Sequence, residues 1–315
     1  MSNIYYNKIL ITGASGLIGS SVAKHLFQRG IDVIPCDKYK ADAKIYPESN
    51  LNWEILDIAD EAAIGMLNRH SISCVIHCAA HPGGLSLKEP SEDVRVNCYG
   101  SMRLFEWCAK QNIPLVYLSS SIIYGESLST KPISEKAPLN PSTIYAVCKV
   151  ACENFLKILA EGYGLRYTVL RIFATYGAGH QPNTYQGIVN VMLTQLLEGN
   201  KLIVKGSLER IRDLIYIEDT AKAIIDCTFN DACFGQTMNI GTGVPVTINE
   251  LINTLCHTLG RKIADIEIIE EEGTVGDPFF NVADISRLKK LTGFSPVYDC
   301  RKGIEDLVVQ RRMSA

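Results

Sequence analysis

A glycine-rich segment near the start of the chain constrains the fold more than any other feature. Residues 12–19 read TGASGLIG, with glycine at every third position from residue 13. The apolar run KILIT at residues 8–12 precedes this segment, and residues 17–29 carry apolar side chains at helical spacing. A strand that turns through glycines directly into a helix is typical of parallel α/β proteins. The segment therefore predicts an α/β fold.

Strand and helix patterns alternate through the first half of the chain. The predicted strands are residues 8–12, 32–36, 53–56, 74–78, 115–119 and 167–172. Long helical patterns cover residues 92–111 and 142–163. Short apolar strands that alternate with helices predict a doubly wound parallel sheet covered on both faces.

The pattern becomes less regular after residue 173. The predicted elements are a loop at 176–183, helices at 187–198, 219–228, 248–259 and 301–311, and strands at 202–204 and 214–217. We predict two domains, a first domain at residues 1–173 and a smaller α/β cap at residues 174–315.

Composition and charge exclude several classes of protein. The 315 residues include 31 Lys and Arg against 34 Asp and Glu, so no basic surface for nucleic acid is expected. No stretch approaches the roughly 18 consecutive apolar residues of a membrane span, and the N-terminus lacks the apolar core of a signal peptide. Eleven scattered cysteines without a Cys-x-x-Cys pair are typical of a reducing compartment, and we expect a cytoplasmic protein with no membrane partner.

One cysteine–histidine pattern has the spacing of a zinc site. It runs Cys74-x-x-His77-Cys78-x-x-His81. Most of it lies in the predicted strand at residues 74–78, where alternate side chains face opposite sides of the sheet and four ligands do not converge. No metal site is therefore predicted.

The glycine segment is predicted to hold the phosphates of a dinucleotide. Glycines allow close approach of the backbone, and the first turn of a helix offers free N–H groups and a positive dipole end. The predicted phosphate-binding residues are Gly13, Gly16, Leu17, Ile18 and Gly19. Asp37 follows Gly19 by 18 residues, near the usual offset of about 20 for a carboxylate that binds ribose hydroxyls. Such a carboxylate repels a 2′-phosphate and favours NAD over NADP, although the neighbouring Lys38 weakens this preference.

A tyrosine and a lysine share one face of a predicted helix. Tyr145 and Lys149 lie four residues apart within residues 142–163. An ammonium group beside a phenol favours the phenolate, a base that can take a proton from a sugar hydroxyl. A second pair with the same spacing, Tyr298 and Lys302, has no glycine segment or serine in a matching context, and we interpret it as part of the surface.

Three serines end a predicted strand, where ligands bind in parallel sheets. They are Ser119, Ser120 and Ser121. One hydroxyl there can hold the substrate oxygen as the proton leaves, but the spacing alone does not choose among the three.

Together these residues resemble the extended short-chain dehydrogenase/reductase family, and within it the NAD-dependent nucleotide-sugar epimerases and dehydratases. The resemblance runs nearly end to end. Besides TGASGLIG it rests on DI at 57–58, HCAA at 77–80, NCYG at 97–100, SSSIIYG at 119–125, LRIFATYG at 170–177, RDLIYIED at 212–219 and NIGTG at 239–243. It implies a Rossmann-type sheet, NAD as cofactor, a nucleotide-diphosphate sugar as substrate and a return of residues 213–243 to the first domain.

The resemblance also implies roles for individual residues. The family's catalytic Ser/Thr stands four positions before Tyr124, which selects Ser120. Further cofactor contacts fall on Asp57, Ile58, Ala79, Ala80, Asn97, Tyr145 and Lys149. Expected substrate contacts are His81, Ser121, Tyr124 and Arg212, the last by pairing with the pyrophosphate. A homodimer formed by residues 92–111 and 142–163 and a place in surface polysaccharide assembly are implied as well.

Departures from the family pattern narrow the reaction. Members that dehydrate or decarboxylate usually carry a glutamate where this chain has Ile122, and Ala174 replaces a common asparagine. The leading hypothesis is an NAD-dependent nucleotide-sugar 4-epimerase acting through a transient 4-keto sugar. The alternative is a 4-keto-sugar nucleotide reductase or dehydrogenase with the same residues. A 4,6-dehydratase and a non-catalytic NAD-binding regulator are less favoured, the regulator because Ser120, Tyr145 and Lys149 are all present.

Overall fold

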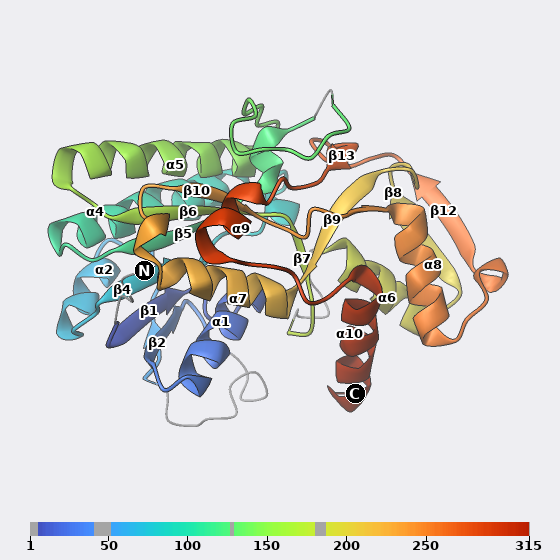
Figure 1. The fold of residues 1–315 in the computed structure, drawn as a ribbon, viewed down its shortest axis with the longest axis horizontal. Helices are drawn as coiled ribbons and strands as arrows, with labels where there is room; N and C mark the ends of the chain where they lie inside the picture. Colours follow the sequence, from blue (N-terminus) through green and yellow to red (C-terminus); the bar gives the residue numbers. More distant parts are fainter. Residues whose placement is uncertain (1–5, 41–51, 127–128, 180–186, 315) are drawn as a thin grey trace.

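A seven-stranded parallel sheet forms the centre of the molecule (Figure 1). The computed structural model describes residues 6–40, 52–126, 129–179 and 187–314. Across the sheet the strands lie in the order β10 (Thr237–Ile240), β6 (Tyr167–Ile172), β5 (Leu115–Ser120), β4 (Cys74–His77), β1 (Lys8–Thr12), β2 (Asp32–Asp37) and β3 (Glu54–Ile55). The strand order reverses at β1, which lies between β2 and β4. In such sheets ligands bind beyond the carboxyl ends of the strands at the point of reversal.

Helices cover both faces of this sheet, as the alternating pattern predicted. One face carries α1 (Leu17–Gln28), α7 (Ile217–Thr228) and α9 (Ser286–Thr292), and the other carries α2 (Ala63–Met66), α4 (Ser101–Lys110) and α5 (Ile144–Tyr163). Within β1, Ile9 and Ile11 are buried in the first apolar cluster, whereas Leu10 is buried in the second. This alternation is the geometry of a strand that is buried on both sides.

The later part of the chain builds a smaller α/β unit, seen on the right of Figure 1. A second sheet contains β7 (Ala174–Tyr176), β9 (Ile211–Tyr216), β11 (Pro245–Thr247) and β13 (Phe280–Asn281), and β8 (Lys201–Lys205) pairs in parallel with β12 (Glu267–Glu271). Helices α6 (Ile188–Glu198), α8 (Ile248–Leu259) and α10 (Cys300–Ser314) pack on these strands through one apolar cluster. Although β10 follows β9 in the chain, it pairs with β6 in the main sheet.

Several predicted boundaries are wrong. The helix predicted at residues 92–111 is confirmed as one helical run over residues 90–110, but its middle is not α-helical, since α3 (Pro90–Glu92) and α4 are joined by a π-helical turn at Asp93–Gly100. The strand predicted at 214–217 is β9, which begins at Ile211, and α7 already begins at Ile217. The strands β7, β11, β12 and β13 were not predicted, because their short sequences show little alternation, whereas β10 lies in the segment 213–243 that was expected to return to the first domain. Residues 180–183 of the predicted loop lie outside the described residues.

Within residues 6–40, 52–126, 129–179 and 187–314, no helix is both long and apolar enough to cross a membrane.

Candidate active site

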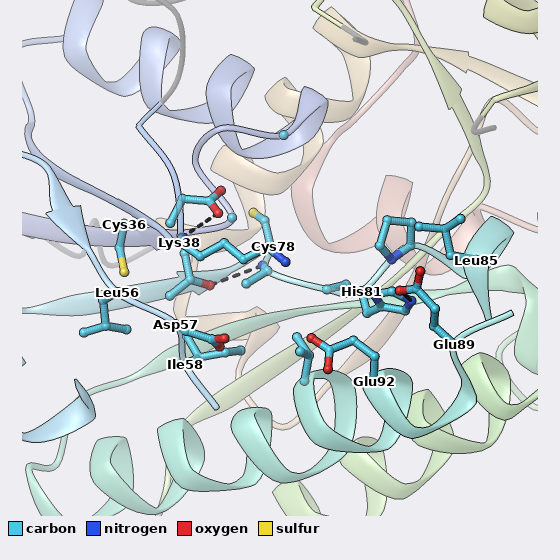
Figure 2. Close-up of a pocket in the computed structure, with 18 of the residues that line it drawn as sticks. Cys36, Lys38, Leu56, Asp57, Ile58, Cys78, His81, Leu85, Glu89 and Glu92 are labelled. Atoms are coloured by element: carbon cyan, nitrogen blue, oxygen red, sulfur yellow. Dashed lines mark hydrogen bonds and ion pairs between the residues drawn. The ribbon is translucent and has the colours of Figure 1, made fainter. Parts of the chain in front are cut away.

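Two adjoining cavities lie at the carboxyl ends of β1, β2, β4 and β5. The larger, about 720 Å³, extends from Asp37 and Asp57 toward the segment that follows β4 (Figure 2). The smaller, about 550 Å³, contains Ser120, Tyr145 and Lys149. The residues that line both cavities are Gly13, Gly16, Cys78, Ala80, His81 and Pro82. Because the two cavities share these residues, they form one path from the end of β2 to the first turns of α5.

The glycine segment leaves no room for side chains at two positions. Gly13 has a φ of +69°, and a Cβ atom there would lie 2.5 Å from the backbone nitrogen of Ala79. A Cβ atom at Gly19 would overlap the carbonyl oxygen of Gly13. Helix α1 begins after Gly16 without a side-chain cap, and Leu17 and Ile18 line the smaller cavity. The N–H groups and the positive end of this helix therefore face a space that can hold an anion.

Asp37 marks the far end of the larger cavity. Its carboxylate accepts hydrogen bonds from the backbone N–H groups of Ser15 (2.9 Å) and Lys38 (2.8 Å). These bonds orient the carboxylate at the rim of the cavity, beside Lys38. A negative group in this position can accept bonds from ribose hydroxyls and disfavours a phosphate.

Asp57 and Ile58 line the same cavity opposite the glycine segment. Asp57 accepts hydrogen bonds from the Ala59 backbone (2.9 Å) and from Arg95 Nη2 (2.7 Å). Partial burial acts to raise the pKa of Asp57, but the bonds from Arg95 and Ala59 outweigh it and hold the pKa below its ordinary value. The carboxylate stays ionised and fixed, whereas Ile58 supplies an apolar surface suited to a flat base.

Asn97 supports the segment that follows β4. Its amide accepts from the backbone nitrogen of His81 (2.6 Å) and donates to the carbonyl oxygen of His81 (3.1 Å) and to Asp93 Oδ1 (2.6 Å). Ala79 and Ala80, just before His81, line the larger cavity, whereas Asn97 lines neither cavity. The structure thus gives Asn97 a positioning contact, and the π-helical turn is what presents its side chain inward.

Tyr145 and Lys149 meet in the smaller cavity. Lys149 is 4% exposed, and its Nζ lies 5.5 Å from the centre of the Tyr145 ring and donates to the carbonyl oxygen of Leu118 at 2.8 Å. Ser86 accepts a hydrogen bond from the backbone nitrogen of Tyr145 at 3.1 Å. The sequence reasoning missed Ser86, because no local pattern relates two residues that lie 59 positions apart. Tyr145, Lys149 and Ser86 are held as one unit at the start of α5.

The three serines at residues 119–121, at the end of β5, have different surroundings in the structure. Ser119 borders the smaller cavity but is buried, and its hydroxyl donates to Glu153 Oε1 at 2.7 Å. Ser121 is also buried and lines neither cavity. Ser120 lines the smaller cavity, where its Oγ accepts only a long bond, 3.4 Å, from the Ile122 backbone. Among the three, Ser120 has the hydroxyl placed to meet a ligand beside Tyr145.

Two expected substrate contacts have other partners in the structure. The Tyr124 hydroxyl donates to Asn239 Oδ1 at 2.7 Å and accepts from Arg171 Nη1 at 2.9 Å. Arg212 on β9 donates to Asp277 Oδ1 at 2.6 Å. Neither Tyr124 nor Arg212 lines the two cavities, and polar groups of the protein bond to the side chains of both.

His77 is a buried structural residue. Its Nδ1 lies 2.6 Å from Thr12 Oγ1, and its Nε2 lies 3.0 Å from Ser101 Oγ. Burial, together with the charge of Lys149, lowers the pKa of His77 to about 3, so the ring is neutral at physiological pH. Within the described part of the chain, no three His, Cys, Asp or Glu side chains gather as metal ligands would.

These features fit a bound dinucleotide. The Gly13 and Gly19 positions exclude Cβ atoms, the start of α1 is open to an anion, and His81 presents a buried ring nitrogen without a hydrogen-bond partner among the described residues. The model of the NAD dependent epimerase/dehydratase family matches residues 9–241, and the chain belongs to that family. NAD is the cofactor of the family, and its members are enzymes that act on sugar nucleotides.

Relatives with different activities are similar to this chain by nearly the same percentage of sequence identity. The chain is 28% identical to the UDP-glucose 4-epimerase of Mycolicibacterium smegmatis, covering 96% of this chain and 97% of the relative. It is 27% identical to the dTDP-4-dehydro-6-deoxyglucose reductase of Escherichia coli, covering 96% of each. The crystal structure of UDP-glucose 4-epimerase from Thermotoga maritima with UDP-glucose superposes with a TM-score of 0.91 at 28% identity, covering 98% and 99% of the two chains. The Rossmann-type fold is thereby confirmed, whereas the relatives differ in the reaction they catalyse.

Proposed function

We propose that this protein is an NAD-dependent nucleotide-sugar 4-epimerase. The observation that carries the proposal is the meeting of Ser120, Tyr145 and Lys149 in a 550 Å³ cavity that continues from the glycine segment. A UDP-hexose is the first substrate class to test, since the 4-epimerases from Mycolicibacterium smegmatis and Thermotoga maritima are named for UDP-glucose.

The path through both cavities is the proposed course of the cofactor. Asp37 would hold the adenosine ribose, with Lys38 beside it, and Asp57 and Ile58 would flank the adenine. The glycine segment would receive the diphosphate at the start of α1, next to Ala79 and Ala80. Tyr145 and Lys149 would face the nicotinamide ribose. When bound, NAD supplies the acceptor and then the donor of the hydride at C4 of the sugar.

The residues of the smaller cavity would transfer one proton and hold the sugar oxygen in place. Tyr145 takes the proton of the sugar 4-hydroxyl as that carbon is oxidised, and returns it when the carbon is reduced on the other face. Lys149, anchored on the Leu118 carbonyl, places its Nζ 5.5 Å from the centre of the Tyr145 ring, where it would hold the nicotinamide ribose and orient the tyrosine. Ser120 donates a hydrogen bond to the sugar oxygen and holds it near Tyr145.

Two features bear on the competing reactions. Ile122 packs against the apolar cluster around Ile123 and Phe173, so this position supplies no carboxylate for the proton transfers of a dehydratase. A 4-keto-sugar reductase would use the same Ser120, Tyr145 and Lys149, and the similarity to the Escherichia coli reductase supports it as the second candidate.

Proton NMR of the sugar anomeric region tests the proposal. Purified protein is incubated with UDP-, GDP-, dTDP- or CDP-hexoses and substoichiometric NAD+. We expect a new 4-epimer to accumulate beyond the amount of NAD+ supplied, because the cofactor is regenerated in each cycle. If no hexose changes, while a 4-keto sugar nucleotide is reduced with stoichiometric consumption of NADH, the reductase is the function.

We also propose a homodimer in the cytoplasm. Large apolar side chains are exposed on two neighbouring helical segments, with Val147 and Ile158 on α5, 51% and 64% exposed, and Val94 and Tyr99 in the π-helical turn. Pairing of these segments with those of a second copy would bury them. Sedimentation should show a dimer for the native chain and a monomer for Ile158→Asp.

The cytoplasmic location is proposed from the cysteines. The described cysteines are all free thiols, which suits a reducing compartment.

A further inference from the structure

His81 is a buried polar side chain that the proposed chemistry does not use. It is 6% exposed and lines both cavities. Its Nε2 has no hydrogen-bond partner within the part of the chain that the structure describes. The closest charged group is the Glu89 carboxylate, whose Oε2 lies 3.6 Å away and beyond hydrogen-bonding distance (Figure 2). A buried ring nitrogen without a partner is unfavourable, so this atom is placed to receive one from a ligand.

The backbone of His81 is held by neighbouring residues of the protein. Asn97 binds both the backbone nitrogen and the carbonyl oxygen of His81, at 2.6 and 3.1 Å. Pro82 follows directly, with a φ of −66°, and restricts the backbone further. A polar group that is fixed on a rigid backbone and lacks a partner is preorganised for binding.

The place of His81 along the path points to the ligand group it would meet. The larger cavity ends at Asp37 and the smaller at Tyr145, and His81 belongs to the short stretch common to both. Gly13 and Gly16 of the phosphate-binding segment line the same stretch. A dinucleotide that runs from Asp37 to Tyr145 crosses this stretch with its middle, which is the diphosphate and the ribose next to it.

We propose that His81 Nε2 hydrogen bonds an oxygen in the middle of the bound dinucleotide, so that His81 is a cofactor-binding residue and not the sugar contact expected from the sequence. An imidazole nitrogen can donate to a phosphate oxygen or exchange a hydrogen bond with a ribose hydroxyl. Glu89, which is 54% exposed, is a positioning residue that orients the ring from the solvent side. The inference rests on the proposed course of the cofactor and is independent of the reaction catalysed.

Calorimetric titration of nucleotide-free protein separates the parts of the cofactor. The probes are NAD+, ADP-ribose and AMP, and AMP lacks both the second phosphate and the second ribose. His81→Leu should weaken binding of NAD+ and ADP-ribose about tenfold and leave AMP binding unchanged. His81→Gln, whose amide can reach the Nε2 position, should lose less. Glu89→Gln should weaken NAD+ binding by a smaller factor than His81→Leu.

Two control variants show whether a loss of binding is specific to His81. His25 forms another His–Glu pair, with Nε2 2.6 Å from Glu218 Oε2 and outside both cavities, so His25→Gln should bind all three probes as the native chain does. Asp37→Ala should weaken all three, including AMP. If Asp37→Ala has no effect, the proposed course of the cofactor fails irrespective of His81.

Two outcomes would overturn the proposal for His81 itself. In the first, His81→Leu binds NAD+ and ADP-ribose with native affinity, but its NAD+ complex binds a UDP-sugar more weakly. That result would make His81 a sugar contact. The second is an equal loss of affinity for AMP, which would mean that the substitution disturbs the site as a whole. Melting temperatures identify variants that fail to fold, and His81→Gln carries the test if His81→Leu is one of them.

Discussion

The backbone nitrogen of Tyr145 donates a hydrogen bond to the hydroxyl of Ser86, 3.1 Å away and 59 residues earlier in the chain. The first N–H groups of a helix have no partner within the helix, so Ser86 supplies one to the residue proposed to move the proton, next to the helix cap Thr143. Gly83 packs on the ring of the same tyrosine, where an added Cβ atom would lie 3.3 Å from the ring carbons. The segment after β4 therefore holds both the backbone and the ring of Tyr145.

Ser86→Ala should lower kcat about tenfold with little change in KM, because the Tyr145 hydroxyl would lose its exact placement relative to the substrate. The control is Ser73→Ala. Ser73 accepts a bond from the Lys8 backbone at 3.0 Å, far from the cavities, and its loss should affect stability alone. Steady-state kinetics that show equal kcat for both variants would contradict a positioning role for Ser86.

Tyr145→Phe should reduce kcat by at least about 10³-fold while the fold and NAD+ content remain, since phenylalanine cannot exchange a proton. Tyr298→Phe is the matched control. Tyr298 also has a lysine one turn later, with Lys302 Nζ 4.5 Å from its ring, but it stacks on Tyr216 away from both cavities. Turnover by Tyr145→Phe at the native rate would exclude the catalytic assignment.

Asp37→Ser should narrow the preference for NAD+ over NADP+ by about tenfold or more, because the carboxylate that repels a 2′-phosphate is removed. Lys38→Ala removes a neighbouring positive charge and should widen the same preference. The dissociation constants of both cofactors, measured at one ionic strength, test this pair of changes. An unchanged ratio in both variants would show that the adenosine ribose lies elsewhere.

His77 should make the stability of the protein depend on pH. Its folded pKa of about 3 lies below the ordinary value of 6.5, so between these values the unfolded chain binds a proton that the folded chain does not. The contribution is complete above pH 6.5 and is lost as the pH falls, by about 2 kcal/mol between pH 7 and pH 5. Urea unfolding of His77→Gln should show a shallower loss over this range than the native chain, and parallel curves would contradict the prediction.

Glu153→Ala should destabilise the fold by about 3–5 kcal/mol, because it leaves the buried Arg171 guanidinium without its charge partner. Glu153 and Arg171 are 2% and 5% exposed and form two hydrogen bonds, at 3.0 and 2.6 Å. The exposed pair Arg301–Glu305 offers the control, and Glu305→Ala should have little effect on the midpoint of unfolding. Similar midpoints for the two variants would contradict the importance of the buried pair.

Features of the fold and the site that depend on residues close together in the chain could be predicted from the sequence. The turn from β1 into α1 requires glycine where a Cβ atom would overlap the backbone, and Tyr145 and Lys149 share a helical face because they lie four residues apart. The helix predicted at residues 92–111 is present, but the sequence did not indicate that its middle is π-helical, where Asp93 and Asn97 turn inward and bond to each other at 2.6 Å. Apolar periodicity does not reveal a π-helical turn that is built around two buried polar side chains.

The sequence by itself determined the parallel α/β architecture, the glycine segment and the tyrosine–lysine pair, because each follows from backbone sterics or from the period of one helix or strand. The resemblance had selected Ser120, but only the tertiary structure decided that the neighbouring Ser119 hydroxyl is used by Glu153. It also decided that Tyr124 bonds to Asn239, 115 residues away, and that His81 lines both cavities with a ring nitrogen that has no hydrogen-bond partner among the described residues. A hydroxyl or ring nitrogen bonds to whatever the folded chain brings near it, and that neighbour is set by the packing of distant segments.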